Sequence, residues 1–181
     1  MKKIILVVFF FIGLSVSQAQ STSDSEQASQ LKWYTDVKEA IKVSNKEKKP
    51  MMMFFTGSDW CGWCMRLQKE VLKTPEFNEW AKANVILVEL DYPRRTPQSD
   101  ELKKQNEELQ YAFGIQGFPT IFFAKATVNK EGKINFEGLG NTGYVAGGPT
   151  AWLAVADPFV KNAAMTPEPK PESKAKKTKK A

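Results

Sequence analysis

The chain has 181 residues, 42% of them hydrophobic, a formal net charge of +6, two cysteines and no histidine. Two cysteines form at most one intramolecular disulfide, which excludes a small scaffold held by several disulfides. The lack of histidine excludes a c-type haem site and removes the usual base of serine and cysteine hydrolases.

The N-terminus has the pattern of a signal peptide over residues 1–19. Two lysines precede the apolar run 4–14, and small residues end the segment as a cleavage site. This run is shorter than the roughly 20 residues of a membrane-spanning helix, so we favour cleavage over an uncleaved membrane anchor. We therefore predict an exported, periplasmic protein whose mature chain begins with a disordered linker over residues 20–30.

The C-terminal residues 166–181 are rich in Pro, Glu, Ser and Lys and contain six lysines against two glutamates. Such a segment cannot bury enough apolar surface to become ordered, so we predict a disordered tail. The tail and the signal peptide supply most of the net charge, which leaves the folded part nearly neutral. The basic charge is therefore no indication of nucleic-acid binding, and we expect a solvated charge run with weak affinity for anionic surfaces.

The segment 31–165 has the length of one domain. After Trp33, apolar residues recur at helical spacing at Val37, Ala40 and Ile41, and the helical pattern ends before Pro50. The sequence therefore predicts that the domain begins with an amphipathic helix.

Two apolar runs of strand length, 51–56 and 85–92, follow this helix, and the second contains Val85-Ile86-Leu87-Val88 without alternation. Runs of this length without alternation are typical of central strands that are covered on both faces. Between them we predict one helix from Gly62 and a second after Thr74, with Thr74 as its N-cap and Pro75 in its first turn. Strand, helix and strand in this order predict a right-handed parallel unit.

The remaining elements follow a long polar loop. A helical pattern covers 99–114, and runs at 120–124 and 134–138 predict two strands that pair as a hairpin. A last helix is predicted over about 150–160, where Pro158 should bend or break it.

Both cysteines lie in the run Trp60-Cys61-Gly62-Trp63-Cys64, where the first predicted strand gives way to a helix. Unpaired N–H groups and the macrodipole at a helix N-terminus favour a thiolate, the form that attacks disulfides. An inert structural disulfide explains the pair poorly, since a loop this short closes little chain entropy. The pattern therefore predicts a redox pair with a reactive Cys61.

Together with Gly117-Phe118-Pro119-Thr120 before the hairpin, this motif and the element order resemble the thioredoxin superfamily, in particular exported thioredoxin-like proteins of bacteria. The resemblance covers nearly all of residues 31–165. It implies an α/β, thioredoxin-like fold with a central mixed β-sheet flanked by helices.

The resemblance also implies a protein-disulfide oxidoreductase. Cys61 would be the exposed thiol that attacks the substrate, and the more buried Cys64 would resolve the mixed disulfide. The residues expected to contact the substrate are Trp60, Gly62, Trp63, Phe118 and Pro119. Pro119 is expected in the cis form, with an ordinary trans proline as the alternative, and for Trp60 the alternative is a core position.

The sequence departs from the thioredoxin pattern at the buried proton acceptor. The position six residues before the first cysteine, which holds a buried acid in thioredoxin, is Phe55 here. The position of the lysine that accompanies this acid is Leu87. Asp59, Glu89 or a water molecule could take the proton from Cys64, so the base stays unassigned. Asp59 with two thiolates would be an unusual zinc site, and we expect no metal and no other cofactor.

We expect a monomer that works in the reductase direction on protein substrates with disulfides or thiols, supplied with electrons by a membrane-bound donor, because exported single-domain relatives commonly work this way. The alternative is a thioredoxin-fold binding or chaperone-like module with little redox turnover, in which Trp60, Trp63 and Phe118 hold partner chains.

Overall fold

The computed structural model describes residues 31–165. The predicted signal peptide, linker and tail lie outside the described residues. Within 31–165, no helix is both long and apolar enough to cross a membrane.

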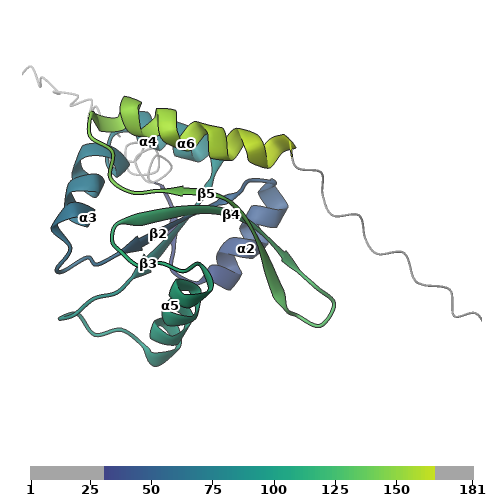
Figure 1. Ribbon diagram of the computed structural model, residues 1–181. Coiled ribbons are helices and arrows are strands. Elements are labelled where there is room, and N and C mark those ends of the chain that lie inside the picture. The colour runs from purple at the N-terminus through teal and green to yellow at the C-terminus, as the bar shows by residue number, and fades with distance from the viewer. Residues whose placement is uncertain (1–30, 166–181) are drawn as a thin grey trace, which may run out of the picture. The chain divides into compact units, whose positions relative to one another are not determined.

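A five-stranded mixed sheet forms the centre of the domain, in the order β1-β3-β2-β4-β5 (Figure 1). Its strands are β1 (Trp33–Tyr34), β2 (Met51–Thr56), β3 (Ile86–Asp91), β4 (Thr120–Val128) and β5 (Ile134–Thr142). Strands β1, β3 and β2 are parallel, whereas β4 runs antiparallel to β2 and β5. All six residues of β2 are buried, as predicted for a central strand.

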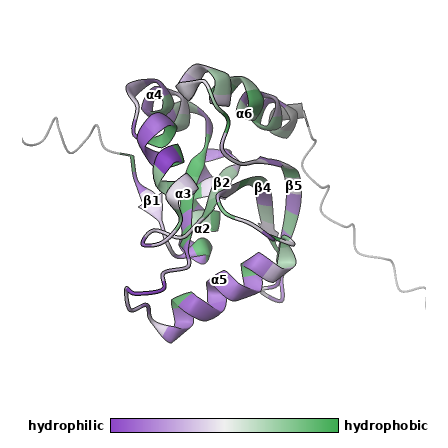
Figure 2. Ribbon diagram, turned by 60° about the vertical axis from the view of Figure 1, so that its left-hand side comes forward, coloured by the Kyte–Doolittle hydropathy of each residue, from purple (hydrophilic) through white to green (hydrophobic). Residues whose placement is uncertain are grey.

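Helices cover both faces of this sheet. They are α2 (Val37–Glu47), α3 (Gly62–Leu67), the π-helical segment η1 (Gln68–Leu72), α4 (Pro75–Asn84), α5 (Asp100–Ala112) and α6 (Gly148–Met165). One apolar cluster joins the sheet to α3, η1, α4 and α6, and a second joins it to α2 and α5. Figure 2 shows an apolar β2 between these layers and a largely polar α5. The predicted α/β fold, with a central mixed sheet flanked by helices, is confirmed.

The local signals at helix starts agree with the structure. The Thr74 hydroxyl accepts a hydrogen bond from the backbone N–H of Phe77, and Pro75 opens α4. Ser99 caps α5 in the same way by accepting from the N–H of Leu102. These caps end the preceding loops and so fix where both helices begin.

Three features differ from the sequence prediction. Trp33 and Tyr34 form the short strand β1, which pairs with β3 and was not predicted. Strands β4 and β5 extend to residues 128 and 142, beyond their predicted ends. The expected break at Pro158 was wrong, because α6 continues through the exposed Pro158 to Met165. Trp152 and Ala163 are buried on either side of this proline and anchor both parts of the helix.

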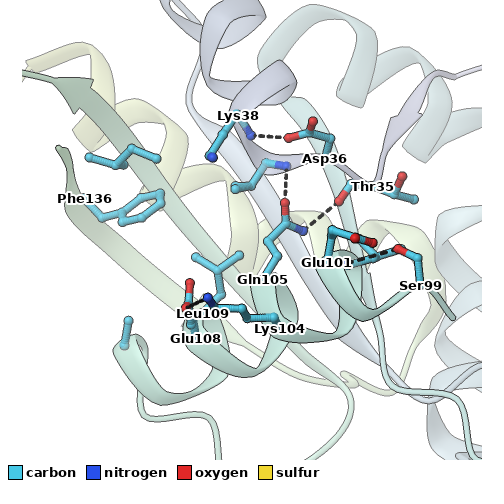
Figure 3. A pocket seen from close by; sticks show the side chains of 14 residues that line it. Thr35, Asp36, Lys38, Ser99, Glu101, Lys104, Gln105, Glu108, Leu109 and Phe136 are labelled. Atoms are coloured by element: carbon cyan, nitrogen blue, oxygen red, sulfur yellow. Dashed lines mark hydrogen bonds and ion pairs between the residues drawn. The ribbon is translucent and has the colours of Figure 1, made fainter. Parts of the chain in front are cut away.

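A pocket of about 720 Å³ lies between α2, α5 and β5 (Figure 3). Gln105 bridges two segments of its wall: the side-chain amide donates to the carbonyl of Thr35 at 2.9 Å and accepts from the N–H of Val37 at 2.9 Å. None of the predicted site residues lines this pocket.

Candidate active site

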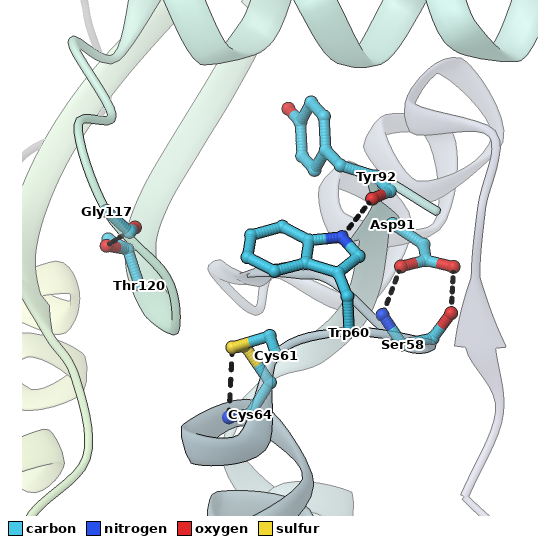
Figure 4. The surroundings of a disulfide bond; sticks show 8 residues. All are labelled: Ser58, Trp60, Cys61, Cys64, Asp91, Tyr92, Gly117 and Thr120. Carbon is cyan, nitrogen blue, oxygen red and sulfur yellow. Dashed lines mark hydrogen bonds between the residues drawn. A yellow bond between two sulfur atoms is a disulfide. The ribbon is translucent and has the colours of Figure 1, made fainter. Parts of the chain in front are cut away.

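Cys61 and Cys64 form a disulfide at the start of α3 (Figure 4). Cys61 is the N-cap of the helix, and its Sγ accepts a hydrogen bond from the backbone N–H of Cys64 at 3.2 Å. Gly62 occupies the first helical position, is exposed, and has open space where a Cβ would stand. The sulfur of Cys61 therefore lies at the positive end of the helix, as the sequence predicted.

The expected exposure of Cys61 was wrong. Cys61 is 6% exposed and Cys64 is fully buried, so Cys61 is only the more accessible of two covered residues. The reason is that both belong to the apolar cluster beneath α3, against which Trp60 and Phe118 pack. Sequence spacing gives the position of a side chain along a helix, but it does not reveal what covers that side chain.

Backbone and side-chain hydrogen bonds hold the turn between β2 and α3. The carbonyl of Gly57 accepts from the N–H of Cys61 at 2.9 Å. The N–H and hydroxyl of Ser58 donate to the two carboxylate oxygens of Asp91 at 2.8 and 2.6 Å. Because Asp91 ends β3, these bonds tie the cysteine turn to the carboxyl end of the neighbouring strand.

Trp60 is half-buried and held from several directions. Its indole N–H donates to the carbonyl of Tyr92 at 2.7 Å, and its ring lies edge-on to Phe118 at 5.6 Å. The guanidinium of Arg94 lies 3.9 Å from the ring centroid. Trp60 is thus neither a fully buried core residue nor a freely exposed one.

The turn from Gly117 to Thr120, which is seen near the disulfide in Figure 4, holds Phe118, whose ring contacts Trp60, and Pro119. The Phe118–Pro119 peptide bond is cis, which confirms that expectation. The hydroxyl of Thr120 donates to the carbonyl of Gly117 at 2.8 Å and closes the turn. Phe118 also contacts Tyr92 at a ring distance of 5.1 Å, so its own ring is half-buried.

Trp63, which lies between the two cysteines in sequence, belongs to a second group of aromatic and charged side chains. Its side chain is 55% exposed, and its ring lies 5.1 Å from that of Tyr144. Arg66 lies over both rings, and its Nε donates to Glu70 at 2.8 Å. The hydroxyl of Tyr144 donates to the same carboxylate at 2.5 Å. The hydrogen bond from Tyr144, followed by that from Arg66, holds the pKa of Glu70 below its ordinary value.

Sequence reasoning missed Tyr144, Arg66 and Arg94. Tyr144 lies in the loop after β5, about 80 residues from Trp63 in sequence, and no local motif marks it. From the sequence alone, Arg66 and Arg94 cannot be distinguished from ordinary surface charges. In the structure, both side chains lie over aromatic rings. Tertiary structure brings Tyr144 to Trp63 and Arg94 to Trp60, whereas Arg66 follows Cys64 by two residues on α3.

The two acids considered as a base lie in different surroundings. The carboxylate of Asp59 accepts hydrogen bonds from the backbone N–H groups of Arg94, Arg95 and Thr96, and the Arg94 bond is the main cause that lowers the pKa of Asp59. Asp59 therefore anchors a loop. Glu89 is half-buried on β3, where burial, and secondly the charge of Asp91, raises its pKa.

Apolar residues fill the two positions where thioredoxins carry a buried acid and lysine: Phe55 and Leu87 are both buried. The buried hydroxyl of Thr56, at the end of β2, has no hydrogen-bond partner among residues 31–165. In the same range, no group of three or more His, Cys, Asp or Glu side chains is arranged to hold a metal ion.

Comparison with known proteins gives consistent matches. A family model described as a thioredoxin-like domain matches residues 37–140. The chain is 35% identical over 119 residues to the disulfide bond reductase DsbH of Chlamydia pneumoniae, a match covering 66% of this chain and 71% of DsbH. It is 31% identical over 119 residues to the thioredoxin-related protein DsbJ of the same organism, a match covering 66% of this chain but 33% of DsbJ.

Two solved structures resemble the domain. A DsbH oxidoreductase superposes with a TM-score of 0.63 at 32% identity, covering 82% of this chain and 94% of that one. A thioredoxin from Thermus thermophilus superposes with a TM-score of 0.52 at 23% identity, covering 75% of this chain and 92% of that one, and this likeness concerns the fold alone.

Proposed function

The chain belongs to the thioredoxin-like family, and from this membership we infer that it is a protein-disulfide oxidoreductase acting through Cys61 and Cys64. The observation that carries the proposal is the hydrogen bond from the Cys64 N–H to Cys61 Sγ at the N-terminus of α3. The same N–H group and the helix dipole would stabilise a thiolate at Cys61 after reduction.

The proposed reaction starts from the reduced pair. The Cys61 thiolate attacks one sulfur of a substrate disulfide, which forms a mixed disulfide and releases the other substrate sulfur as a thiolate that takes up a proton. Cys64 then loses its proton and attacks Cys61 Sγ. The Cys61–Cys64 disulfide forms, the substrate leaves as a dithiol, and two electrons have passed to it.

Exposure supports this division of roles, because Cys61 is the more accessible of the two cysteines and Cys64 is fully buried. The surrounding groups would form the docking surface for an extended substrate, with aromatic contacts from Trp60, Trp63 and Phe118. The exposed backbone at Gly62 leaves space for close approach, and the turn at Pro119 faces the site.

We propose the reductase direction, because the relative DsbH is named a disulfide bond reductase. Each turnover consumes a reduced pair, so an electron donor must restore it, and we propose a membrane-bound one. We also propose that the N-terminal segment directs export to the periplasm and that the protein is a monomer.

The test is reduction of insulin by the full-length protein with dithiothreitol as the electron donor. The wild type should reduce insulin faster than dithiothreitol alone, and Cys61→Ser should abolish that acceleration because the attacking thiol is lost. Reduced Cys64→Ser, mixed with insulin after dithiothreitol has been removed, should accumulate a mixed disulfide through Cys61, which mass spectrometry detects. Full activity of Cys61→Ser, or an inactive wild type, would instead favour a binding module whose exposed Trp63 holds partner chains.

A further inference from the structure

We propose that Arg66, Arg94 and Arg95 form a cationic rim around the Cys61–Cys64 pair, which selects protein substrates that carry carboxylate side chains beside their disulfide. The inference rests on the proposed function and adds the substrate class. It concerns arginines on two separate segments, α3, which begins at the cysteines, and the loop after β3, which is hydrogen-bonded to Asp59.

Arg94 and Arg95 are fixed to the cysteine turn. The carboxylate of Asp59, two residues before Cys61, accepts from the backbone N–H of Arg94 at 3.0 Å and of Arg95 at 2.7 Å. The Arg94 side chain then lies over the ring of Trp60 at 3.9 Å. Its guanidinium is therefore held beside the residue that precedes the attacking cysteine.

Arg66 is held on α3, two residues after Cys64. It lies 5.3 Å from the ring centroid of Trp63 and 5.1 Å from that of Tyr144, and Nε donates to Glu70. The side chain is 52% exposed. Besides Glu70, the hydroxyl of Tyr144 is a hydrogen-bond partner of Arg66, and the exposed part of the guanidinium can bind a group from outside.

The acidic side chains near the pair are already engaged. Asp59 accepts from three backbone N–H groups, Asp91 accepts from Ser58, and Glu70 accepts from Arg66 and Tyr144. Lys69, exposed on η1, adds a further positive charge close to Glu70. The guanidinium groups of Arg66, Arg94 and Arg95 stay exposed beside these engaged carboxylates, and their charge complements an anion.

A carboxylate is the anion that fits these donors on a protein substrate. The planar guanidinium presents paired N–H groups that match the two oxygens of a carboxylate, and an aromatic ring beneath it restricts its orientation. Exposed pairs of this kind are weak singly, each changing a binding or rate constant by about 2- to 5-fold. Three together would give a preference of about 10-fold.

The experiment uses three disulfide-linked peptides of one sequence, with Asp, Asn or Lys on both sides of the cysteines. The second-order rate constant for reduction by the reduced full-length protein is measured for each at low and high salt. We expect the Asp peptide to react about 10-fold faster than the Lys peptide, and 1 M salt to narrow the ratio because the Debye length falls to about 3 Å.

The variant R66Q/R94Q/R95Q should bring the Asp-to-Lys ratio close to one. The matched control is K46Q/K130Q/K133Q, which removes the same charge from exposed positions in the last turn of α2 and in the β4–β5 turn. These positions lie at the end of the sheet away from the cysteines, because β4 runs antiparallel to β2. The control should keep the wild-type ratio.

Three results would contradict the proposed cationic rim. They are equal rates for the three peptides, an Asp-to-Lys rate ratio that persists in the arginine variant, and the same loss of this ratio in the lysine control. If the neutral Asn peptide were not reduced at all, the proposed function itself would fail. The Asp-to-Lys rate ratio is measured on one and the same variant, so a general loss of activity lowers both rates and leaves the ratio unchanged.

Discussion

Replacing Gly57 with alanine should displace Trp60 from its place beside the cysteine turn. A Cβ on Gly57 would stand 2.3 Å from Cε2, 2.5 Å from Nε1 and 2.6 Å from Cζ2 of Trp60. Ordinary contact begins near 3.4 Å, so the ring must move by at least about 1 Å. The indole N–H would then lose its 2.7 Å hydrogen bond to the carbonyl of Tyr92.

The steric overlap and the lost hydrogen bond together determine how far the free energy of unfolding falls. Overpacking of this kind costs about 1–3 kcal/mol and the lost hydrogen bond about 1 kcal/mol, so the free energy of unfolding should fall by about 2–4 kcal/mol. Urea unfolding of the oxidised protein, followed by circular dichroism, measures this value. The φ angle of Gly57 is not in the left-handed region, so the contact with Trp60 is the cause being tested.

Gly62→Ala is the matched control. A Cβ there meets nothing within 4 Å, and the residue lies in a helix, where alanine is favoured over glycine by about 0.5–1 kcal/mol. This variant should be as stable as the wild type or slightly more stable. A Gly57→Ala protein within about 0.5 kcal/mol of the wild type would refute the close packing of Trp60 on Gly57.

Three further substitutions test the surroundings of the cysteines. Burial raises the pKa of Glu89, so the ionised carboxylate opposes folding. Glu89→Gln should therefore raise the free energy of unfolding at pH 7. This gain should shrink as the pH falls and vanish below about 4.3, the pKa of glutamate in the unfolded state. Urea unfolding between pH 4 and 7 checks the trend, and a gain independent of pH contradicts it. Thr56→Val removes a buried hydroxyl without a partner among the described residues and should stabilise the protein by about 1–2 kcal/mol; a loss of stability would show that the hydroxyl has a partner. Tyr144→Phe should raise the pKa of Glu70 towards its ordinary value, while Arg66 keeps it partly lowered; carboxyl NMR titration measures this, and an unchanged pKa would rule out the hydrogen bond.

The parts of the fold that could be predicted from the sequence depend on local chemistry. Thr74 and Ser99 signal helix starts because a capping hydroxyl acts within one turn. The apolar run of β2 predicts a central strand because both of its faces are covered. The cysteine motif and the turn at Pro119 could be recognised because each is a contiguous run of residues.

The features that the sequence did not reveal depend on contacts between distant segments. The strand β1 is two residues long and exists only through its pairing with β3. Tyr144 reaches Trp63 and Glu70 across the fold. The low exposure of Cys61 results from Trp60 and Phe118 packing on the cluster that contains it, and the continuation of α6 past Pro158 results from burial on both sides.

The most direct test of the account is the pH dependence of alkylation at Cys61. The rate of iodoacetamide reaction is measured from pH 4 to 9 on the reduced full-length Cys64→Ser protein, with reduced Cys61→Ser as the comparison. Stabilised at the N-terminus of α3, Cys61 should react with a midpoint well below about 8.5, the pKa of a free cysteine, and much faster than Cys64. A midpoint at or above that value, or a faster reaction at Cys64, would contradict the assignment of Cys61 as the attacking thiolate.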